Sequence, residues 1–255
     1  MMAVDVGNTQ TVLGLFDGDE LRGQWRLATE AHRTADELAV VFAGFLGLQG
    51  MRLERVNAMI VSSVVPGLAR SYRDLAGEIL DVAYYPVNVR METSLKNRYG
   101  DPAAVGADRI VNAVAVGRHY GFPAIIIDIG TATTVEAVDG EGCYLGGAIL
   151  TGLYVALDAL ISHTAKLPSV DLEAEPPRVI ATNTPDSIRS GFIYGYAGAI
   201  DALVRRSREE LREKGVRVVA TGGDARVIAR HCQEIEEFDP DLTLKGLYAL
   251  YEMNC

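Results

Sequence analysis

Two short segments of this chain, about half a sequence apart, have nearly the same amino-acid pattern. Residues 5–12 read DVGNTQTV, and residues 128–135 read DIGTATTV. Each segment follows a short apolar run and precedes another, so each predicts a β-hairpin whose polar turn contains glycine. One turn of this kind is an ordinary hairpin loop, whereas two copies predict a chain built from two related α/β halves.

The pattern of apolar residues predicts the same order of elements in both halves. In the first half we expect strands at 2–6, 11–16 and 20–27, a helix after the N-cap Thr34, a strand at 56–62, a helix at 66–80 and a strand at 82–87. In the second half we expect strands at 124–128, 133–138, 144–149 and 216–220, helices at 151–164, 186–214 and 242–253, and an exposed Pro-rich connector at 167–178. This order predicts an α/β fold with mixed sheets flanked by helices, in two domains at 1–120 and 121–255.

The composition is acidic and typical of a globular protein. Of the 255 residues, 49% are apolar and 23% are charged, and the formal net charge is −10 at pH 7. Because phosphate polyanions are held by clustered Lys and Arg, this charge argues against a nucleic-acid surface or an anionic-membrane surface. No apolar run approaches the roughly 20 residues of a bilayer span, and no secretory signal is evident, so we expect a cytoplasmic protein.

The two turns carry groups that suit the phosphates of a nucleotide. Glycine at Gly7 and Gly130 allows the backbone to approach a ligand closely. Asp5, at the end of a strand, can hold Mg²⁺ largely through water molecules. The hydrogen-bond donors of the first turn are Asn8, Thr9 and Thr11. Since the chain has no GxxxxGK[ST] pattern, we expect nucleotide affinity to depend on backbone donors and on the metal.

Two further clusters can take part in chemistry. Gly222 and Gly223 follow an expected strand, at a position where backbone can lie flat against a base or ribose. Asp108 and Arg109 stand at the expected start of a helix that runs to Tyr120. There an aspartate can accept a hydroxyl proton and an arginine can hold a carboxylate through two parallel hydrogen bonds. Taken alone, the same pair is also explained by an acid that favours the helix dipole and by a surface arginine.

Three glycines lie on about one face of the helix expected at 186–214, at Gly191, Gly195 and Gly198. Each glycine costs roughly 1 kcal/mol relative to alanine in a helix interior, so the missing side chains need a reason. Either another element of the same chain packs closely there or the face is a subunit interface. We expect a subunit interface.

The paired turns resemble the phosphate loops of the superfamily that contains actin, the heat-shock ATPases and the acetate and sugar kinases. Over its whole length the chain is also similar to type III pantothenate kinases, whose motifs occur in the same order. The matching segments are residues 5–9, 97–100, 106–109, 128–134, 146–149, 164–168, 183–184, 221–223 and 242–254.

This resemblance implies two ribonuclease-H-like (actin-like) domains with a nucleotide cleft between them. It implies ATP-dependent phosphorylation of the primary hydroxyl of pantothenate, the first step toward coenzyme A, by a homodimer that uses Mg²⁺ and K⁺ or NH₄⁺. Asp108 then matches the proton acceptor, and Asp128 matches a ligand of the monovalent cation. The implied substrate-binding residues are Tyr99, Gly106, Ala107, Asp108, Arg109 and Thr184. The implied nucleotide-binding residues are Asp5, Val6, Gly7, Asn8, Thr9, Gln10, Thr11, Gly130, Thr131, Thr133, Gly222 and Gly223.

Some positions depart from the pattern of that family. Leu150-Thr151-Gly152 stands where a Pro-Gly pair is usual, so we expect a differently shaped start of the next helix. Gln10 replaces a commoner Asn, and Glu136 replaces a commoner Asp. Two other functions stay open: a related kinase for another small hydroxy acid, and a non-catalytic nucleotide-binding regulatory protein.

Overall fold

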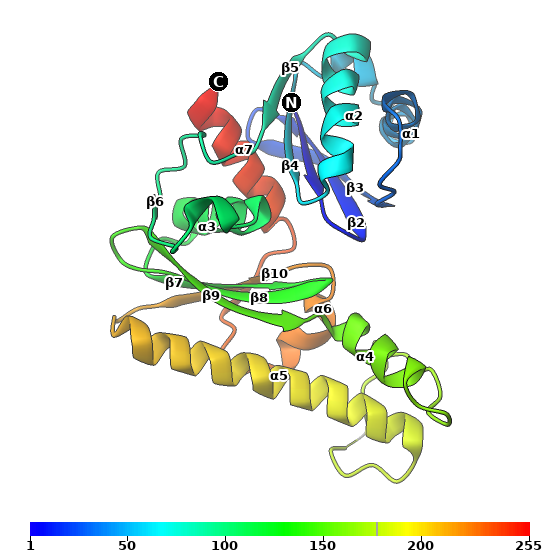
Figure 1. Cartoon of the computed structure of the whole chain (residues 1–255), viewed down its shortest axis with the longest axis vertical. Helices are drawn as coiled ribbons and strands as arrows, with labels where there is room; N and C mark the ends of the chain where they lie inside the picture. Colours follow the sequence, from blue (N-terminus) through cyan, green and yellow to red (C-terminus); the bar gives the residue numbers. More distant parts are fainter. Residues whose placement is uncertain (177) are drawn as a thin grey trace. The chain divides into compact units, whose positions relative to one another are not determined.

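The chain forms two compact units, defined by which of its residues contact one another. The computed structural model, drawn in Figure 1, describes residues 1–176 and 178–255. Unit 1 comprises Met1–Ser94, Gly100–Arg118 and Leu242–Cys255, and unit 2 comprises Leu95–Tyr99 and His119–Asp241. The domains at 1–120 and 121–255 stay a prediction, and the contact units differ from those limits at 95–99, 119–120 and 242–255.

Unit 1 is built on a five-stranded mixed sheet in the order β3-β2-β1-β4-β5. An antiparallel meander of β1 (Met2–Val6), β2 (Gln10–Asp17) and β3 (Glu20–Ala28) is extended by the parallel strands β4 (Ala58–Ser63) and β5 (Ala83–Pro86). These five strands confirm the predicted ones to within two residues at each end. Strands first in meander and then in parallel account for the mixed sheet.

Helices α1 (Ala35–Gly47) and α2 (Ala69–Asp74) pack against the sheet and form the core of this unit together with its strands. Phe42 of α1 and Tyr72 of α2 are buried in one cluster with Met2 and Val4 of β1. Their burial removes large apolar surfaces from water, which is the main favourable term in folding. Short helical turns at Leu53–Arg55, Pro66–Leu68 and Pro102–Ala104 complete this part of the chain.

The helical segment predicted at 66–80 is confirmed over residues 66–79, but the type of helix changes along it. A 3-10 turn at Pro66–Leu68 leads into α2, and a π-helical turn follows at Leu75–Ile79. Leu80 N–H accordingly donates to the carbonyl of Leu75, five residues back. The side-chain periodicity alone does not reveal these changes of hydrogen-bond spacing.

The N-cap predicted at Thr34 is confirmed. The Thr34 Oγ1 accepts from Glu37 N–H at 3.3 Å, and the Glu37 carboxylate accepts from Thr34 N–H at 2.8 Å. This reciprocal capping box satisfies two backbone donors at the start of α1.

We expect Thr34→Ala to lower the free energy of unfolding by about 1 kcal/mol, because a donor at the start of α1 loses its acceptor. Urea unfolding followed by circular dichroism measures this difference. Thr34→Ser retains the hydroxyl and serves as the control. Equal stability of the alanine variant and the wild type would contradict the prediction.

Helices α3 (Ala107–His119) and α7 (Leu242–Asn254) confirm the helices predicted from Asp108 to Tyr120 and at 242–253. Thr243 of α7 donates to Asn112 of α3 at 2.8 Å. A Cβ added to Gly246 would lie 2.2 Å from the carbonyl oxygen of Val111, so glycine there permits the close packing of α7 on α3. The C-terminal helix thereby joins unit 1 although it is far away in the sequence.

Unit 2 is built on a six-stranded mixed sheet in the order β11-β10-β7-β8-β9-β6. The predicted strands are confirmed as β7 (Ala124–Ile129), β8 (Ala132–Val138), β9 (Cys143–Thr151) and β10 (Arg217–Thr221). The two edge strands, β6 (Lys96–Asn97) and β11 (Glu237–Phe238), were not predicted, because two residues are too few to show an alternating pattern.

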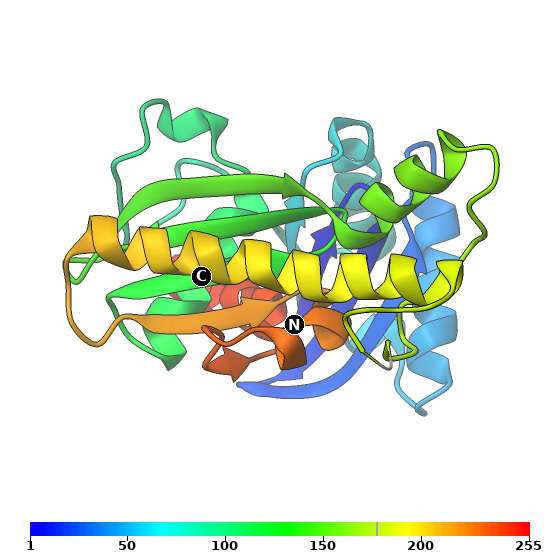
Figure 2. The ribbon, with the colours of Figure 1, turned by 90° about the horizontal axis from the view of Figure 1, so that it is seen from below.

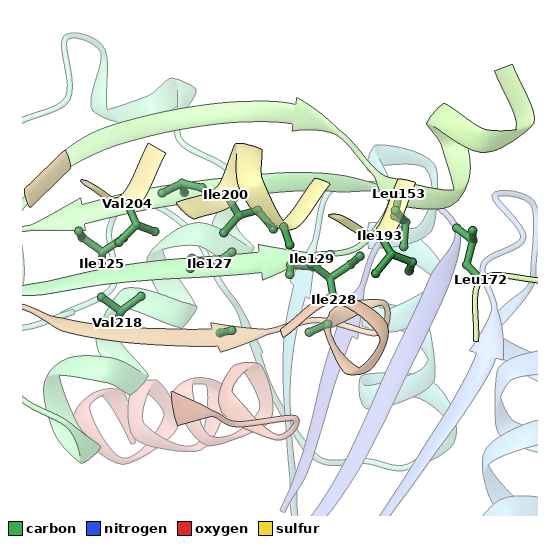
Figure 3. Packing of buried hydrophobic residues seen from close by; sticks show 14 of the residues in the cluster. Ile125, Ile127, Ile129, Leu153, Leu172, Ile193, Ile200, Val204, Val218 and Ile228 are labelled. Atoms are coloured by element: carbon green, nitrogen blue, oxygen red, sulfur yellow. The ribbon is translucent and has the colours of Figure 1, made fainter. Parts of the chain in front are cut away.

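The long helix α5 (Thr184–Leu211) covers one face of this sheet, and Figure 2 shows it stretched along the strands. Figure 3 shows three of its residues, Ile193, Ile200 and Val204, packed toward alternate residues of β7, namely Ile125, Ile127 and Ile129. This packing follows from side-chain spacing: residues three or four apart share a face of a helix, and residues two apart share a face of a strand. Helix α5 ends three residues earlier than predicted, where Arg212 adopts a left-handed conformation (φ 56°).

The helices α4 (Leu153–Ser162) and α6 (Ala225–Ile228) complete unit 2. The connector predicted at 167–178 has no helix or strand among its described residues, and Pro177 lies outside them. The expectation that it is exposed is wrong at Leu172, which is fully buried in the same cluster as the core residues of α5. An apolar side chain inside a loop thus binds that loop to the core.

Candidate functional site

The first predicted phosphate turn joins β1 to β2 in unit 1. Gly7 N–H donates to the carbonyl of Gln10 at 3.0 Å, and a Cβ on Gly7 would lie 2.9 Å from the same oxygen. Glycine is therefore needed for this tight turn. Asn8, Thr9 and Gln10 are exposed at its tip, and Asp5 is half-buried at its base.

Thr11 lies differently from the exposed residues of this turn. Its side chain is buried, and its hydroxyl is 2.9 Å from that of Thr29 on the adjoining chain segment. Val6 is also fully buried, so its side chain is not available to a ligand. The role of Thr11 in nucleotide binding stays a prediction. The observed contact indicates that Thr11 stabilises the turn through its hydrogen bond with Thr29.

Three groups behind the first turn were not singled out from the sequence. Burial raises the pKa of Tyr72 to about 12, against a smaller opposite effect of the Thr11 hydroxyl and of Arg33. Ser62, the β4 residue in register with Asp5, is fully buried. Its Oγ and the Nη1 of Arg33 have no hydrogen-bond partner within the described residues. The phenol of Tyr72 and the buried donors of Ser62 and Arg33 thus lie near the base of the turn. They are far from it in the sequence, and folding brings them there.

Asp108 and Arg109 lie in the first turn of α3, as predicted. The Asp108 Oδ1 accepts from Arg109 N–H at 2.8 Å. A Cβ on Gly106 would lie 2.5 Å from this oxygen, so glycine leaves room for the carboxylate to fold back on the helix start. The interpretation of Arg109 as a surface residue is wrong, since its residue surface is only 9% exposed. Buried arginines in proteins are usually paired, so the guanidinium belongs to the packed interior at the start of α3 and not to the open surface.

The second predicted phosphate turn joins β7 to β8 in unit 2. Gly130 N–H donates to the carbonyl of Ala132 at 3.0 Å, and Thr131 is exposed at the tip. A Cβ on Gly152 would lie 2.1 Å from the Gly130 carbonyl oxygen, so the turn rests directly on this glycine. Gly152 is the last residue of the segment Leu150-Thr151-Gly152 noted above, and it is also the N-cap of α4.

The structure brings the predicted glycine pair against this turn. Gly222 has φ 104°, and a Cβ there would lie 2.6 Å from Asp128 Oδ1 and 2.3 Å from the carbonyl oxygen of Ile129. Asp224 N–H donates to that carbonyl at 3.0 Å. Burial raises the pKa of Asp224, which is a second acidic side chain at this place that sequence reasoning did not assign.

Tyr99 belongs to unit 2 through a short segment that adds β6 to the edge of the sheet. Asn97 pairs with Tyr144 of β9, and Tyr99 N–H donates to the Asn97 side chain at 2.9 Å. The Tyr99 ring lies over Gly146 (φ 108°), where a Cβ would be 2.9 Å from the ring atoms. The buried Tyr144 hydroxyl donates to the Glu136 carboxylate, which gives the departure at position 136 a partner.

Thr184 opens helix α5 and borders an apolar groove. The helix is capped by Asn183, whose side chain accepts from Asp186 N–H at 2.9 Å. The groove has a volume of about 510 Å³ and is lined by Leu160, Leu167, Thr184, Ser187, Ile188, Gly191, Phe192, Gly195, Tyr196 and Ala199. Cβ atoms added to Gly191, Gly195 and Gly198 would meet no described atom within 4 Å. Close packing against the described part of the chain is therefore not the reason for these glycines.

The predicted site residues are divided between the units. Unit 1 carries residues 5–11 and 106–109, and unit 2 carries Tyr99, the turn from Asp128 to Thr133, Thr184 and the glycine pair at 222–223. Within unit 2 the second turn, Asp128 and Gly222 lie together. The nucleotide cleft between two domains stays a prediction. None of the described helices is both long and apolar enough to cross a membrane.

A family model and several known proteins match this chain over most or all of its length. The sequence model of the family described as type III pantothenate kinase matches residues 1–206. The type III pantothenate kinase of Rubrobacter xylanophilus is 64% identical over 258 residues, which cover 100% of this chain and 98% of that protein. The type III pantothenate kinase of Syntrophotalea carbinolica is 43% identical over 254 residues, covering 100% and 99% of the two chains.

Among solved structures, the fold is similar to that of component A of (R)-2-hydroxyglutaryl-CoA dehydratase from Acidaminococcus fermentans. The TM-score is 0.55 at 16% identity, and the match covers 98% of this chain and 96% of the other. At this identity the likeness concerns the fold alone, an α/β chain with two mixed sheets. With a family model that spans most of its length and full-length relatives at 64% and 43% identity, the chain belongs to the type III pantothenate kinase family.

Proposed function

We propose that this protein transfers the γ-phosphoryl group of ATP to the primary hydroxyl of pantothenate, the first step of coenzyme A biosynthesis. One observation carries the proposal: the chain is 64% identical over its full length to a type III pantothenate kinase. The local geometry supports it, because in each unit the predicted phosphate turn is tight, contains glycine and has an exposed tip. Such turns offer backbone N–H groups to phosphate oxygens.

In this proposal the acceptor alcohol is handled by the start of α3. Phosphoryl transfer passes through a loose transition state, so the hydroxyl proton needs to leave only late and orientation matters most. Asp108 orients the hydroxyl and receives its proton, and Arg109 holds the carboxylate of pantothenate through paired hydrogen bonds. Tyr99, Gly106, Ala107 and Thr184 are the further contacts that we assign to the substrate.

The oxygen ligands of the two turns suit the proposed cations, Mg²⁺ and K⁺ or NH₄⁺. Among the described residues, no group of three or more His, Cys, Asp or Glu side chains is arranged to hold a metal ion. Mg²⁺ commonly keeps several water molecules and binds through one or two carboxylates plus substrate phosphates, which suits the single Asp5. We assign K⁺ or NH₄⁺ to Asp128, beside the carbonyl of Ile129. A bound cation there offsets negative charge near the phosphates.

We also propose that the groove along α5 is covered by a second copy of this chain. Its lining is almost entirely apolar, and three glycines leave open space on the same helix. Val155 and Leu160 of the neighbouring α4 are exposed, by 43% and 36%. Apolar surface of this kind gains from being removed from water, and the resemblance implies a homodimer.

The proposal is tested by measuring ADP release with pantothenate and Mg²⁺-ATP in buffers that contain K⁺, NH₄⁺ or Na⁺ as the only monovalent cation. We expect turnover with pantothenate that is several-fold faster in K⁺ or NH₄⁺ than in Na⁺, because the phosphate loops carry no lysine. Equal rates in Na⁺ alone would contradict the cation site.

Two results would replace the proposed substrate or activity. Turnover of another small hydroxy acid, with none of pantothenate, would select a related kinase. ATP binding without turnover of any alcohol would select a regulatory nucleotide-binding protein. Light scattering on the same samples tests the dimer.

A further inference from the structure

The side chain of Tyr196 connects the groove face of α5 to the second phosphate turn. Its hydroxyl lies 2.6 Å from the carbonyl oxygen of Thr151 and 2.8 Å from the Oγ1 of Thr133. The same residue lines the apolar groove. One half-buried side chain therefore borders both places.

The direction of these hydrogen bonds follows from their chemistry. A phenol has one hydrogen, and a carbonyl oxygen only accepts, so Tyr196 donates to Thr151 and accepts from the hydroxyl of Thr133. Burial raises the pKa of Tyr196, so the phenol keeps this proton near neutral pH. The Thr133 side chain is fully buried. Its hydroxyl hydrogen thus points to Tyr196, behind the turn.

The carbonyl of Thr151 belongs to the segment on which the turn rests. Thr151 pairs with Ala132 across β8 and β9. The next residue, Gly152, donates its N–H to the carbonyl of Thr131 at 3.1 Å and leaves no room for a Cβ beneath Gly130. Moving the end of β9 would therefore move the Gly130-Thr131 backbone.

We infer that Tyr196 is a positioning residue for the nucleotide: its hydroxyl fixes the end of β9 and Thr133, and so holds the Gly130-Thr131 turn in the geometry that binds phosphate. The inference rests on the proposed function only for the identity of the nucleotide.

The test compares Tyr196→Phe with Tyr194→Phe. Tyr194 lies on the same helix, and its hydroxyl faces the carbonyl of Pro176 at 3.5 Å, a long contact outside the turn. Calorimetric titration with Mg²⁺-ATP should give a dissociation constant about three- to tenfold higher for Tyr196→Phe and an unchanged one for Tyr194→Phe. The KM for pantothenate should stay within about twofold of wild type in both, since only the nucleotide turn loses its support.

A second pair of variants separates positioning from general loss of stability. Thr133→Val removes the partner hydroxyl and should weaken ATP binding about as much as Tyr196→Phe, whereas Thr133→Ser keeps a hydroxyl for Tyr196 and should bind ATP more tightly than Thr133→Val. The double variant should be no weaker than the weaker single variant, because both remove the same contact.

Each result supports or overturns the inference. Unchanged ATP affinity in Tyr196→Phe, or equal weakening in Tyr194→Phe, overturns it, even where the melting temperature falls. Wild-type protein that binds ATP but does not phosphorylate pantothenate would remove the proposed substrate and leave the inference standing. Wild-type protein that does not bind ATP overturns both.

Discussion

Asp108→Asn should lower turnover with pantothenate by about 10²-fold or more, the usual effect of losing a positioned proton acceptor. The Asp108 Oδ1 accepts from Arg109 N–H at 2.8 Å, and an asparagine oxygen can accept the same hydrogen bond. The start of α3 is therefore expected to fold as before, while the carboxamide cannot take the hydroxyl proton. Initial rates at saturating ATP measure the loss, and calorimetry should show ATP binding retained.

Asp101→Asn is the matched control for this variant. Asp101 precedes α3, is exposed, and its Oδ1 accepts from Ala103 N–H at 3.0 Å, so the substitution again keeps the local hydrogen bond. We expect turnover within about twofold of wild type, as for other exposed sites. Unchanged turnover in Asp108→Asn would remove this residue from the mechanism. A comparable loss in Asp101→Asn would assign the effect to local folding.

Gly222→Ala should reduce both turnover and stability. Its φ of 104° is rarely adopted by residues with a side chain, and the new Cβ would lie 2.3 Å from the Ile129 carbonyl oxygen and 2.6 Å from Asp128 Oδ1. The loop after β10 must then move by about an ångström away from the second turn, a displacement that can cost roughly 10²-fold in rate. Steady-state kinetics and the midpoint of thermal unfolding measure the two effects.

Gly215→Ala separates backbone strain from the clash. Gly215 precedes β10, has φ 70°, and has no described atom within 4 Å of an added Cβ. This variant should lose roughly 1–2 kcal/mol of stability from the left-handed backbone and keep its turnover. Equal turnover in Gly222→Ala and Gly215→Ala would contradict the prediction for Gly222.

Much of the fold could be predicted because local rules decide it. Alternating apolar residues around a glycine-containing turn specify a hairpin, and the meanders β1-β2-β3 and β7-β8-β9 follow these rules closely. The Thr34 cap and the start of α3 were likewise visible in a few adjacent residues. The π-helical turn after α2 and the two-residue strands β6 and β11 were not, since short irregular elements depend on their neighbours in space.

The candidate site shows the same division. The exposure of Asn8, Thr9 and Thr131 follows from their place at a turn tip. The burial of Thr11 and Thr133 was not foreseen, although both stand just after a turn with similar sequence. Each threonine lies at the start of a strand with its side chain toward the interior. The hydroxyl that it contacts there, of Thr29 or of Tyr196, comes from a residue far away in the sequence.

By itself the sequence determined the family, the two glycine-containing acidic turns and most strands and helices, because each of these depends on residues close together along the chain. Only the tertiary structure decided that Gly222 lies on Asp128, that Tyr99 lies over Gly146 and that Tyr196 holds Thr133. These contacts join residues tens of positions apart. They are set by how sheets and helices pack, and no local pattern of side chains encodes that packing.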